Sequence, residues 1–175
     1  TGALAGIVAG LVDLTARVGL GPGDVAIVLG DDEWSAVLAD FCAARGLRVF
    51  HAGAAAPARA ERLTGDAATW GTRLATPGEG HAATHAERKI FLPSPTPALA
   101  ATALTLLRAG DTWVMGRGAV DVVLPLARLP LVRVLVHDGG HPDFVPEALA
   151  SLRRGDLDAI TIARRLGYEL RLLVP

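Results

Sequence analysis

Three consecutive acidic residues, Asp31, Asp32 and Glu33, are the side chains whose types and spacing could do chemistry in this sequence. They follow an apolar run over residues 25–29, and carboxylates at the end of a buried strand could hold Mg²⁺, which prefers carboxylate oxygens and water. The structural alternative is that these acids cap the N-terminus of a following helix, where the helix dipole stabilises negative charge. We favour the capping interpretation, and the sequence predicts no catalytic residue and no metal site.

Two groups of histidines give weaker signals. His81 and His85 stand four residues apart, so a helix would place both imidazoles on one face, as in a metal site. Gly78 and Gly80 disfavour a helix there, and we expect exposed loop histidines. The segment 137–141 begins and ends with histidine and could form a ligand cluster, but it is typical of the polar turn that follows a strand.

The elements that must position these residues follow from the hydrophobic periodicity. Apolar residues at helical spacing alternate with short β-branched runs that lack polar alternation, as expected of strands buried on both faces of a parallel sheet. The pattern predicts helices over 3–18, 34–45, 98–109, 120–126 and 145–154, strands over 25–29, 47–51, 89–92, 112–115, 131–136 and 169–174, and short or irregular elements over 57–88. This alternation predicts an α/β fold, a doubly wound parallel Rossmann-like sheet with helices on both faces, in a single domain over residues 1–175.

Composition excludes several classes of protein. The 175 residues are 51% hydrophobic and 20% charged, which is typical of a globular domain and not of a disordered chain. A net charge of -1, from 17 basic and 18 acidic residues, leaves no surplus for phosphate neutralisation, so we expect no nucleic-acid partner. Every apolar stretch is shorter than the ~20 residues that cross a bilayer, so we expect no membrane span. The single cysteine, Cys42, lies in an apolar helical pattern, which predicts a buried thiol and a cytoplasmic location.

The turn after the first predicted strand is where such a fold normally holds phosphate on glycine amides and a helix N-terminus. Against the dinucleotide fingerprint G-x-G-x-x-G, this chain keeps Gly30 but has Asp32 and Ser35 at the second and third glycine positions. Like charges ~4 Å apart repel by ~1 kcal/mol in water and ~4 kcal/mol at an effective dielectric of ~20. We therefore expect severely weakened pyrophosphate binding and predict no cofactor, with Gly30, Asp32 and Ser35 as the remains of a cofactor site.

The ribose position gives a second test of nucleotide binding. Dinucleotide-binding folds place Asp or Glu at the end of the second strand, whereas this chain has His51, Ala52 and Gly53 there. Arg59 and Arg62 follow and could meet the 2′-phosphate of NADP, but we favour a solvated helix face for both. Two elements of the fingerprint are therefore missing.

Four passages resemble the cofactor-binding domain of the medium-chain dehydrogenase/reductase superfamily, which includes the zinc-type alcohol dehydrogenases and quinone reductases. Residues 20–30 are similar to its L-x-P-G-D/E turn and first strand, and residues 98–116 to its helix and fifth strand around LLRPGG and VxxG. Residues 64–68 are similar to its LGAD third-strand segment, and residues 143–158 to its late ALxLLxxGxLD helix. The resemblance covers nearly the whole chain in the correct order and implies the same fold.

The same resemblance carries implications for activity and partners. The family's N-terminal GroES-like catalytic domain, which carries zinc ligands or the substrate pocket, is absent from this sequence, and the turn over 93–97 is rich in proline where the family approaches the nicotinamide. The family's sixth strand pairs with a second copy across a two-fold axis, and Leu131 to Val136 matches that strand. The resemblance thus implies a homodimer, or docking of this edge onto a related domain in a larger synthase.

Three functions are compatible with these residues. The leading hypothesis is a degenerate dehydrogenase-like Rossmann domain, a pseudoenzyme that serves as a structural or interaction module of a biosynthetic enzyme. The second is the cofactor domain of an NAD(P)-dependent reductase or dehydrogenase whose catalytic domain lies elsewhere. The third is a module that binds Mg²⁺ or a cationic ligand, because residues 25–53 are also similar to the start of a response-regulator receiver domain, although the strand over 89–92 runs into Pro93 instead of ending in Asp. Trp34, beside the acidic residues, could stack on a ligand, but tryptophan is more often packed in a core.

Overall fold

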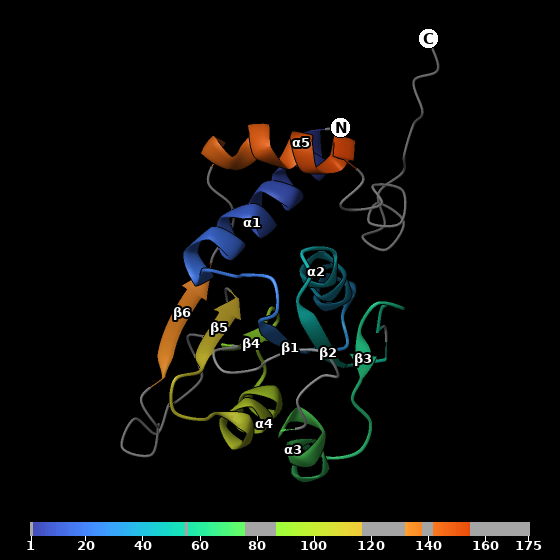
Figure 1. The fold of residues 1–175 in the computed structure, drawn as a ribbon, viewed down its shortest axis with the longest axis vertical. Helices are drawn as coiled ribbons and strands as arrows, with labels where there is room; N and C mark the ends of the chain where they lie inside the picture. Colours follow the sequence, from blue (N-terminus) through green and yellow to red (C-terminus); the bar gives the residue numbers. More distant parts are fainter. Residues whose placement is uncertain (1, 55, 76–86, 117–131, 138–141, 155–175) are drawn as a thin grey trace. The chain divides into compact units, whose positions relative to one another are not determined.

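The computed structural model describes residues 2–54, 56–75, 87–116, 132–137 and 142–154. The chain divides into two compact units, one made of residues 1–19 and 139–175 and the other of residues 20–138. The second unit carries the sheet, and the first contains the earliest and the latest of the described helices (Figure 1). That residues 1–175 form a single domain stays a prediction.

The unit of residues 20–138 contains a six-stranded sheet in which all the strand pairs are parallel. Its strands are β1 (Val25–Leu29), β2 (Arg48–Ala52), β3 (Glu61–Arg62), β4 (Arg88–Leu92), β5 (Thr112–Gly116) and β6 (Arg133–His137) (Figure 1). Their order across the sheet is β3-β2-β1-β4-β5-β6, which is the Rossmann order. The doubly wound order of receiver domains, 2-1-3-4-5, has no strand beyond the second, whereas here the two-residue β3 pairs with the outer edge of β2.

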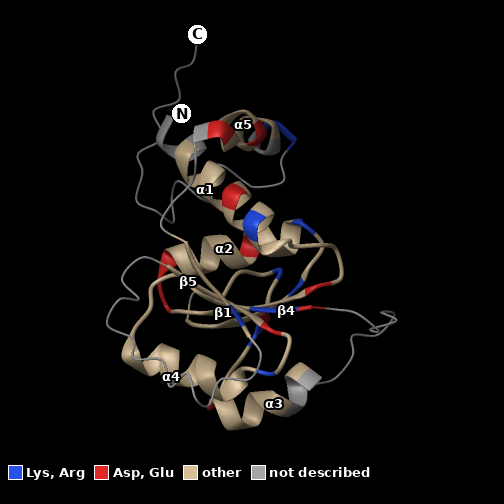
Figure 2. Cartoon of the chain, turned by 90° about the vertical axis from the view of Figure 1, so that its left-hand side faces the viewer, with Lys and Arg blue, Asp and Glu red and all other residues tan. Residues whose placement is uncertain are grey.

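Helices cover both faces of this sheet. Figure 1 shows α2 (Glu33–Ala44) on one face and both α3 (Ala67–Ala75) and α4 (Pro97–Leu106) on the other. The side chain of Thr96 accepts a hydrogen bond from the backbone N–H of Leu99 and thereby caps α4, which begins with a proline. α4 has no charged residue and is tan throughout in Figure 2, so packing against the sheet must stabilise it.

A Schellman motif ends α2 and directs the chain into β2. The N–H of Gly46 donates to the carbonyl oxygen of Ala43 (3.0 Å), and the N–H of Leu47 donates to that of Cys42 (3.2 Å). Gly46 has a φ of +81°, a conformation that favours glycine. The glycine that the sequence places after this helix therefore has a specific backbone role.

Side chains of the central strands alternate between the two faces of the sheet. Ile90 and Trp113 belong to the core cluster that includes the buried residues of α3 and α4.

Lys89, the only lysine of the sequence, is the neighbour of Ile90 on β4, and its side chain is fully buried. It forms ion pairs with Glu87 and with Asp24, whose Oδ2 lies 3.8 Å from Nζ. The hydrogen bond and charge of Lys89 lower the pKa of Glu87, because both stabilise the carboxylate.

In its described part, the other unit consists of α1 (Gly2–Val18), the short 3-10 helix η3 (Pro142–Phe144) and α5 (Val145–Arg154). α1 contacts both η3 and α5. Within α1, Arg17 donates a hydrogen bond to Asp13 (2.8 Å), one helical turn earlier. None of the helices that the structure describes is both long and apolar enough to cross a membrane.

The predicted fold class is confirmed, and two predicted boundaries are wrong. The helix expected over 98–109 ends at Leu106, because Leu107 is extended (φ −63°, ψ 136°) and the Asp111 carboxylate accepts a hydrogen bond from the N–H of Arg108 (2.8 Å). The segment 64–68 does not form the third strand. β3 precedes it, and Asp66 instead caps α3 by accepting a hydrogen bond from the N–H of Thr69 (3.0 Å).

Several predicted features lie outside the described residues. They are the helix over 120–126, the strand over 169–174, His81, His85, and residues 138–141 of the second histidine group. His137 is described and is the last residue of β6, so it belongs to a strand and not to the turn that we expected. The edge strand predicted over 131–136 is described from Arg133 to His137.

Cys42 gives the first testable prediction. Its side chain is fully buried in α2, and burial raises the pKa of its thiol to about 12. Because the thiolate is the reactive form, we expect dithiobis(nitrobenzoate) at pH 8 to label the folded chain on the order of 10³-fold more slowly than the chain unfolded in guanidinium chloride. The absorbance of released thionitrobenzoate measures both rates, with a Cys42→Ala variant as the blank. Equal rates would contradict the buried position.

Candidate functional site

The acidic turn, residues 30–33, follows the carboxyl end of β1 in the middle of the sheet. β1 pairs with β2 on one side and with β4 on the other, so the order of the strands reverses at β1. Open parallel sheets bind ligands outside the carboxyl ends of their strands at such a switch point. The structure therefore brings the predicted site residues Gly30, Asp32 and Ser35 to the position where this fold binds ligands.

Ser35 fills the space beside Gly30. Ser35 is fully buried in the first turn of α2, and a Cβ atom added to Gly30 would overlap its Oγ. Gly30 has a φ of +156° and donates a hydrogen bond to the carbonyl oxygen of Ala52 (3.1 Å). The first glycine of the fingerprint is thus required by packing against Ser35, with or without a ligand.

The Asp32 carboxylate occupies the N-terminus of α2. Its Oδ1 accepts a hydrogen bond from the N–H of Ser35 (2.8 Å), and its Oδ2 accepts one from the Ser35 hydroxyl (3.0 Å). Asp32 has an extended backbone (φ −84°, ψ 161°), as expected of an N-cap residue. The anion position of this helix is therefore filled by a carboxylate of the chain itself, which confirms the capping interpretation for Asp32.

Asp31 joins the acidic turn to the segment after β2. Its Oδ1 accepts a hydrogen bond from the N–H of Ala54 (2.8 Å). A Cβ atom on Gly53 would overlap the carbonyl oxygen of Gly30, so the two segments are also in backbone contact. Sequence reasoning missed this link, because the bond joins residues 23 apart at the ends of two strands. Asp31 and Asp32 thus both hold the acidic turn in place through hydrogen bonds.

A second close approach lies at the ends of β4 and β5. A Cβ atom on Gly116, the last residue of β5, would overlap the carbonyl oxygen of Pro93. Pro93 directly follows β4 and begins the proline-rich turn that leads to α4. The glycine at the end of β5 therefore lets the turn after β4 approach the backbone of the neighbouring strand.

The other candidate residues range from fully buried to exposed. His51, at the predicted ribose position, is fully buried in β2, and Trp34 is half-buried in the first turn of α2. Arg59 and Arg62 are exposed, the first in the segment after β2 and the second in β3, so neither lies on the helix face that we expected. Among the described residues, no group of three or more His, Cys, Asp or Glu side chains is placed to hold a metal ion.

A buried ion pair is a feature that sequence reasoning missed. Nη2 of Arg88, at the start of β4, lies 3.5 Å from Oδ2 of Asp111. Burial lowers the pKa of Arg88 and raises that of Asp111, because a poorly solvated site disfavours both charged forms. The register that pairs Lys89 with Thr112 places Arg88 beside Asp111. The two residues can therefore be recognised as neighbours only when the pairing of the strands is known.

Comparison with solved structures identifies the architecture. Galactitol-1-phosphate dehydrogenase from Escherichia coli superposes with a TM-score of 0.69 at 12% identity, over 99% of this chain and 58% of that protein. 2R,3R-butanediol dehydrogenase from Bacillus subtilis gives a TM-score of 0.68 at 18% identity, over 95% and 53%. The quinone oxidoreductase from Thermus thermophilus gives 0.58 at 17% identity, over 86% and 50%.

These likenesses concern the fold. No protein-family profile matches the sequence, and no curated protein sequence matches it significantly. The chain spans about half the length of the three enzymes. The chain thus shares its Rossmann-like fold with these dehydrogenases and this oxidoreductase, and this is the fold that the resemblance in its sequence implied.

The hydrogen bonds of Asp32 predict the effect of two substitutions. Asp32→Ala removes the cap and leaves two donors of the buried Ser35 without an acceptor, so we expect the free energy of unfolding to fall by about 1–2 kcal/mol. Asp32→Asn keeps an oxygen at the cap, and Asn caps helices about as well as Asp, so we expect near wild-type stability. Urea unfolding followed by circular dichroism measures both variants. Equal losses of stability would show that the charge, and not the cap, matters.

Proposed function

We propose that this chain is a degenerate dehydrogenase-like Rossmann domain that does not bind a dinucleotide at its first turn and serves as a structural or interaction module of a biosynthetic enzyme. A cytoplasmic location accords with its single, buried cysteine, since such a chain forms no internal disulfide. The three enzymes it was compared with are about twice its length, which supports a role as one part of a larger assembly.

The observation that carries this proposal is the pair of hydrogen bonds from Ser35 to the Asp32 carboxylate. A pyrophosphate could bind at the N-terminus of α2 only by displacing Asp32. The loss of this helix cap would lower the free energy of unfolding by about 1 kcal/mol. With the carboxylate left nearby, each like-charge contact at ~4 Å would add a further ~1–4 kcal/mol, depending on exposure to solvent. These terms together, about 2–5 kcal/mol, weaken phosphate binding by a factor of roughly 30 to 4,000.

The end of β2 supports the same conclusion. A dinucleotide-binding fold uses an acidic residue there to accept hydrogen bonds from the ribose hydroxyls. In this chain β2 ends in His51 and Ala52, and the Ala54 amide that follows donates to Asp31. The turn and the segment after β2 therefore satisfy each other's polar groups, and the end of β2 offers no carboxylate of its own to a ribose.

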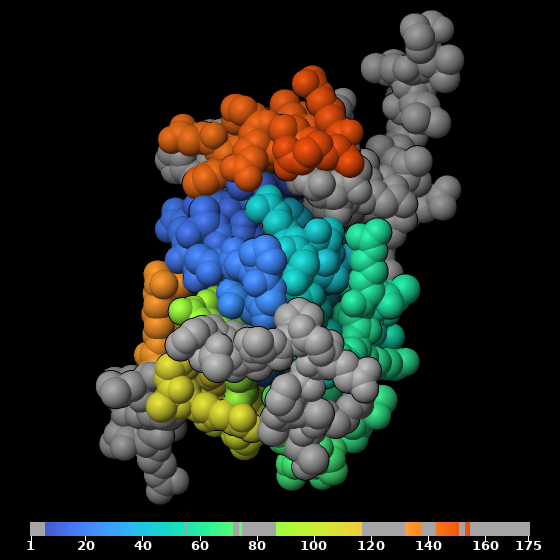
Figure 3. Space-filling view, viewed as in Figure 1, coloured from blue at the N-terminus to red at the C-terminus, as the bar shows by residue number. Residues whose placement is uncertain are grey.

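We propose in addition that β6 carries the partner interface, as a homodimer or with a related domain of a larger synthase. β6 pairs with β5 along one edge, and among the strands that the structure describes it is the last in the order of the sheet. The side chain of Val136 is 61% exposed, and Figure 3 shows β6 in orange on the surface. An exposed edge strand with an exposed apolar side chain invites pairing with another strand.

Cofactor titration tests the proposed loss of the nucleotide site. We expect isothermal titration of NADH and NADPH into the wild-type chain to show no binding up to about 1 mM. The double substitution Asp32→Gly and Ser35→Gly restores both fingerprint glycines, and we expect it to bind one of the two cofactors measurably. Glycine is a tolerable N-cap, although the glycine within the first turn of α2 costs about 1 kcal/mol, so circular dichroism must first show that the variant is folded.

The matched control is Asp32→Asn, which removes the charge but keeps an oxygen over the helix N-terminus. Because Asn still occupies the anion position, we expect this variant to bind more weakly than the double glycine variant. Micromolar binding by the wild-type chain would overturn the proposal and support the alternative, an NAD(P)-dependent reductase domain that works with a catalytic domain elsewhere.

Substitution of the edge strand tests the proposed interface. We expect sedimentation velocity at about 50 µM to show a dimer of the wild-type chain and at least a tenfold weaker dimer for Val136→Lys, because a symmetric interface would bring two ammonium groups together. Ala101→Lys, which places the same charge on an exposed position of α4, is the control and should leave the dimer intact. A wild-type monomer at this concentration would rule out the homodimer, and equal dimerisation of all three chains would place the interface elsewhere.

A further inference from the structure

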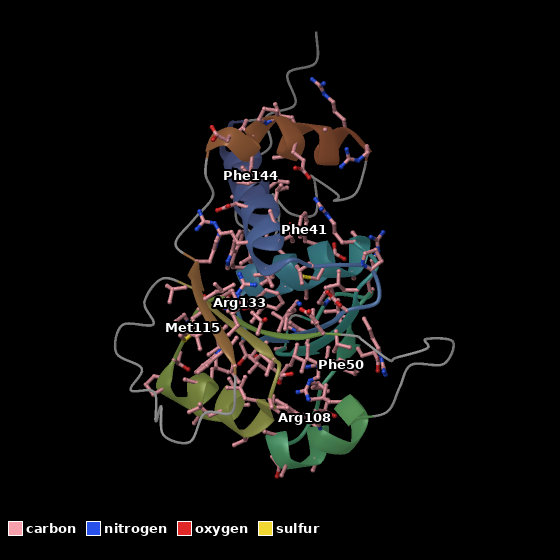
Figure 4. The ribbon with its side chains drawn as sticks, turned by 60° about the vertical axis from the view of Figure 1, so that its left-hand side comes forward. Phe41, Phe50, Arg108, Met115, Arg133 and Phe144 are labelled. Carbon is pink, nitrogen blue, oxygen red and sulfur yellow. The ribbon has the colours of Figure 1, made fainter. Side chains whose placement is uncertain are left out.

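A pocket of about 430 Å³ lies between α3 and α4, away from the acidic turn. Its lining includes Arg88, the first residue of β4, whereas the acidic turn follows the last residue of β1. Because the strands are parallel, the pocket is near the amino end of the sheet and the acidic turn is at its carboxyl end. Figure 4 shows Arg108, another lining residue, beside the junction of α3 and α4.

Arg88 brings to this pocket a positive charge with two hydrogen-bond donors that no described residue satisfies. Its side chain is only 12% exposed, and its Nη2 donates a hydrogen bond to the carbonyl oxygen of Leu106 (2.9 Å). Its Nε and Nη1 are buried and have no hydrogen-bond acceptor within the described part of the chain. Burial lowers the pKa of Arg88, the Asp111 carboxylate raises it, and the nearby charge of Arg108 lowers it. The effect of burial reflects the poor solvation of the cationic form.

The carboxylates near the pocket are already engaged. Asp111 lies 3.5 Å from Arg88, but its Oδ2 also accepts the hydrogen bond from the N–H of Arg108. Asp66 accepts a hydrogen bond from the N–H of Thr69 and thereby caps α3. Arg108 is exposed, and its guanidinium forms no ion pair with any residue that the structure describes. Two guanidinium groups therefore line the pocket together with one carboxylate, that of Asp66, which also caps α3.

We propose that this pocket binds a small organic anion, with its carboxylate or phosphate group at Arg88 and Arg108 and a short apolar tail against Ala68, Leu74 and Leu107. The apolar side chains line the same pocket as the two arginines. Its volume falls in the range of small-molecule sites, about 300–1,000 Å³. Guanidinium groups bind carboxylate and phosphate through charge-assisted hydrogen bonds, and the anion would compensate the like charges of the two arginines. This site is independent of the nucleotide position at the acidic turn.

The test is a titration followed by NMR of the ¹⁵N-labelled full chain at constant ionic strength. The probes are butanoate and inorganic phosphate, with butylammonium as a cation of the same tail length. We expect saturable shifts of the Nε–Hε signals of Arg88 and Arg108 with butanoate or phosphate, at a dissociation constant on the order of 1 mM. We expect butylammonium to leave these signals unshifted.

Two variants locate the binding. Arg108→Gln removes an exposed guanidinium from the pocket, and we expect it to weaken anion binding about tenfold without affecting the fold. Arg59→Gln removes an equally exposed arginine after β2 and is the control for the change in net charge. The proposal is overturned if no anion gives saturable shifts up to about 50 mM, if both variants bind alike, or if butylammonium binds as well as butanoate.

Discussion

The two hydrogen bonds from Ser35 to the Asp32 carboxylate are the interaction on which the first turn of this fold depends. They cap α2 and hold the Ser35 side chain against Gly30, so that the helix starts close to the end of β1. In a nucleotide-binding Rossmann fold, a bound phosphate satisfies donors at this helix end. Here a carboxylate of the chain itself, that of Asp32, accepts the hydrogen bonds of Ser35 at this helix end.

The buried strands were predictable because their sequences are unambiguous. β1, β4 and β5 are short, mostly apolar runs between turn residues, and the requirement that both their faces be covered implies the parallel sheet. The end of α4 was not predictable in this way. Leu107 and Arg108 are good helix formers, and the helix ends before them because the Asp111 carboxylate accepts a hydrogen bond from the N–H of Arg108. β3 has two residues, too few for any periodicity to show.

The contacts of the candidate site also fall into two groups, those between residues close in the sequence and those between residues far apart in it. The cap of Asp32 joins residues three apart, and the spacing of an acid, a helix and a serine made it a reasonable expectation. The bond from Ala54 to Asp31 and the pair of Arg88 with Asp111 join residues that become neighbours only when strands pair in a particular order. A single sequence contains the partners of such contacts but not the register that brings them together.

The two ends of the sheet differ in how their charges are compensated, and this difference bears on where a ligand would act. At the carboxyl end, Asp31 and Asp32 accept hydrogen bonds from backbone amides of the chain. At the amino end, Arg88 keeps buried donors without acceptors among the described residues, which costs about 1–3 kcal/mol for each unmet group. An apolar residue at the start of β4 would avoid that cost, whereas the ion pair with Asp111 offsets part of the cost of burying the charge of Arg88. A buried cation beside an open pocket is therefore better explained by an anion that binds it than by the stability of the sheet.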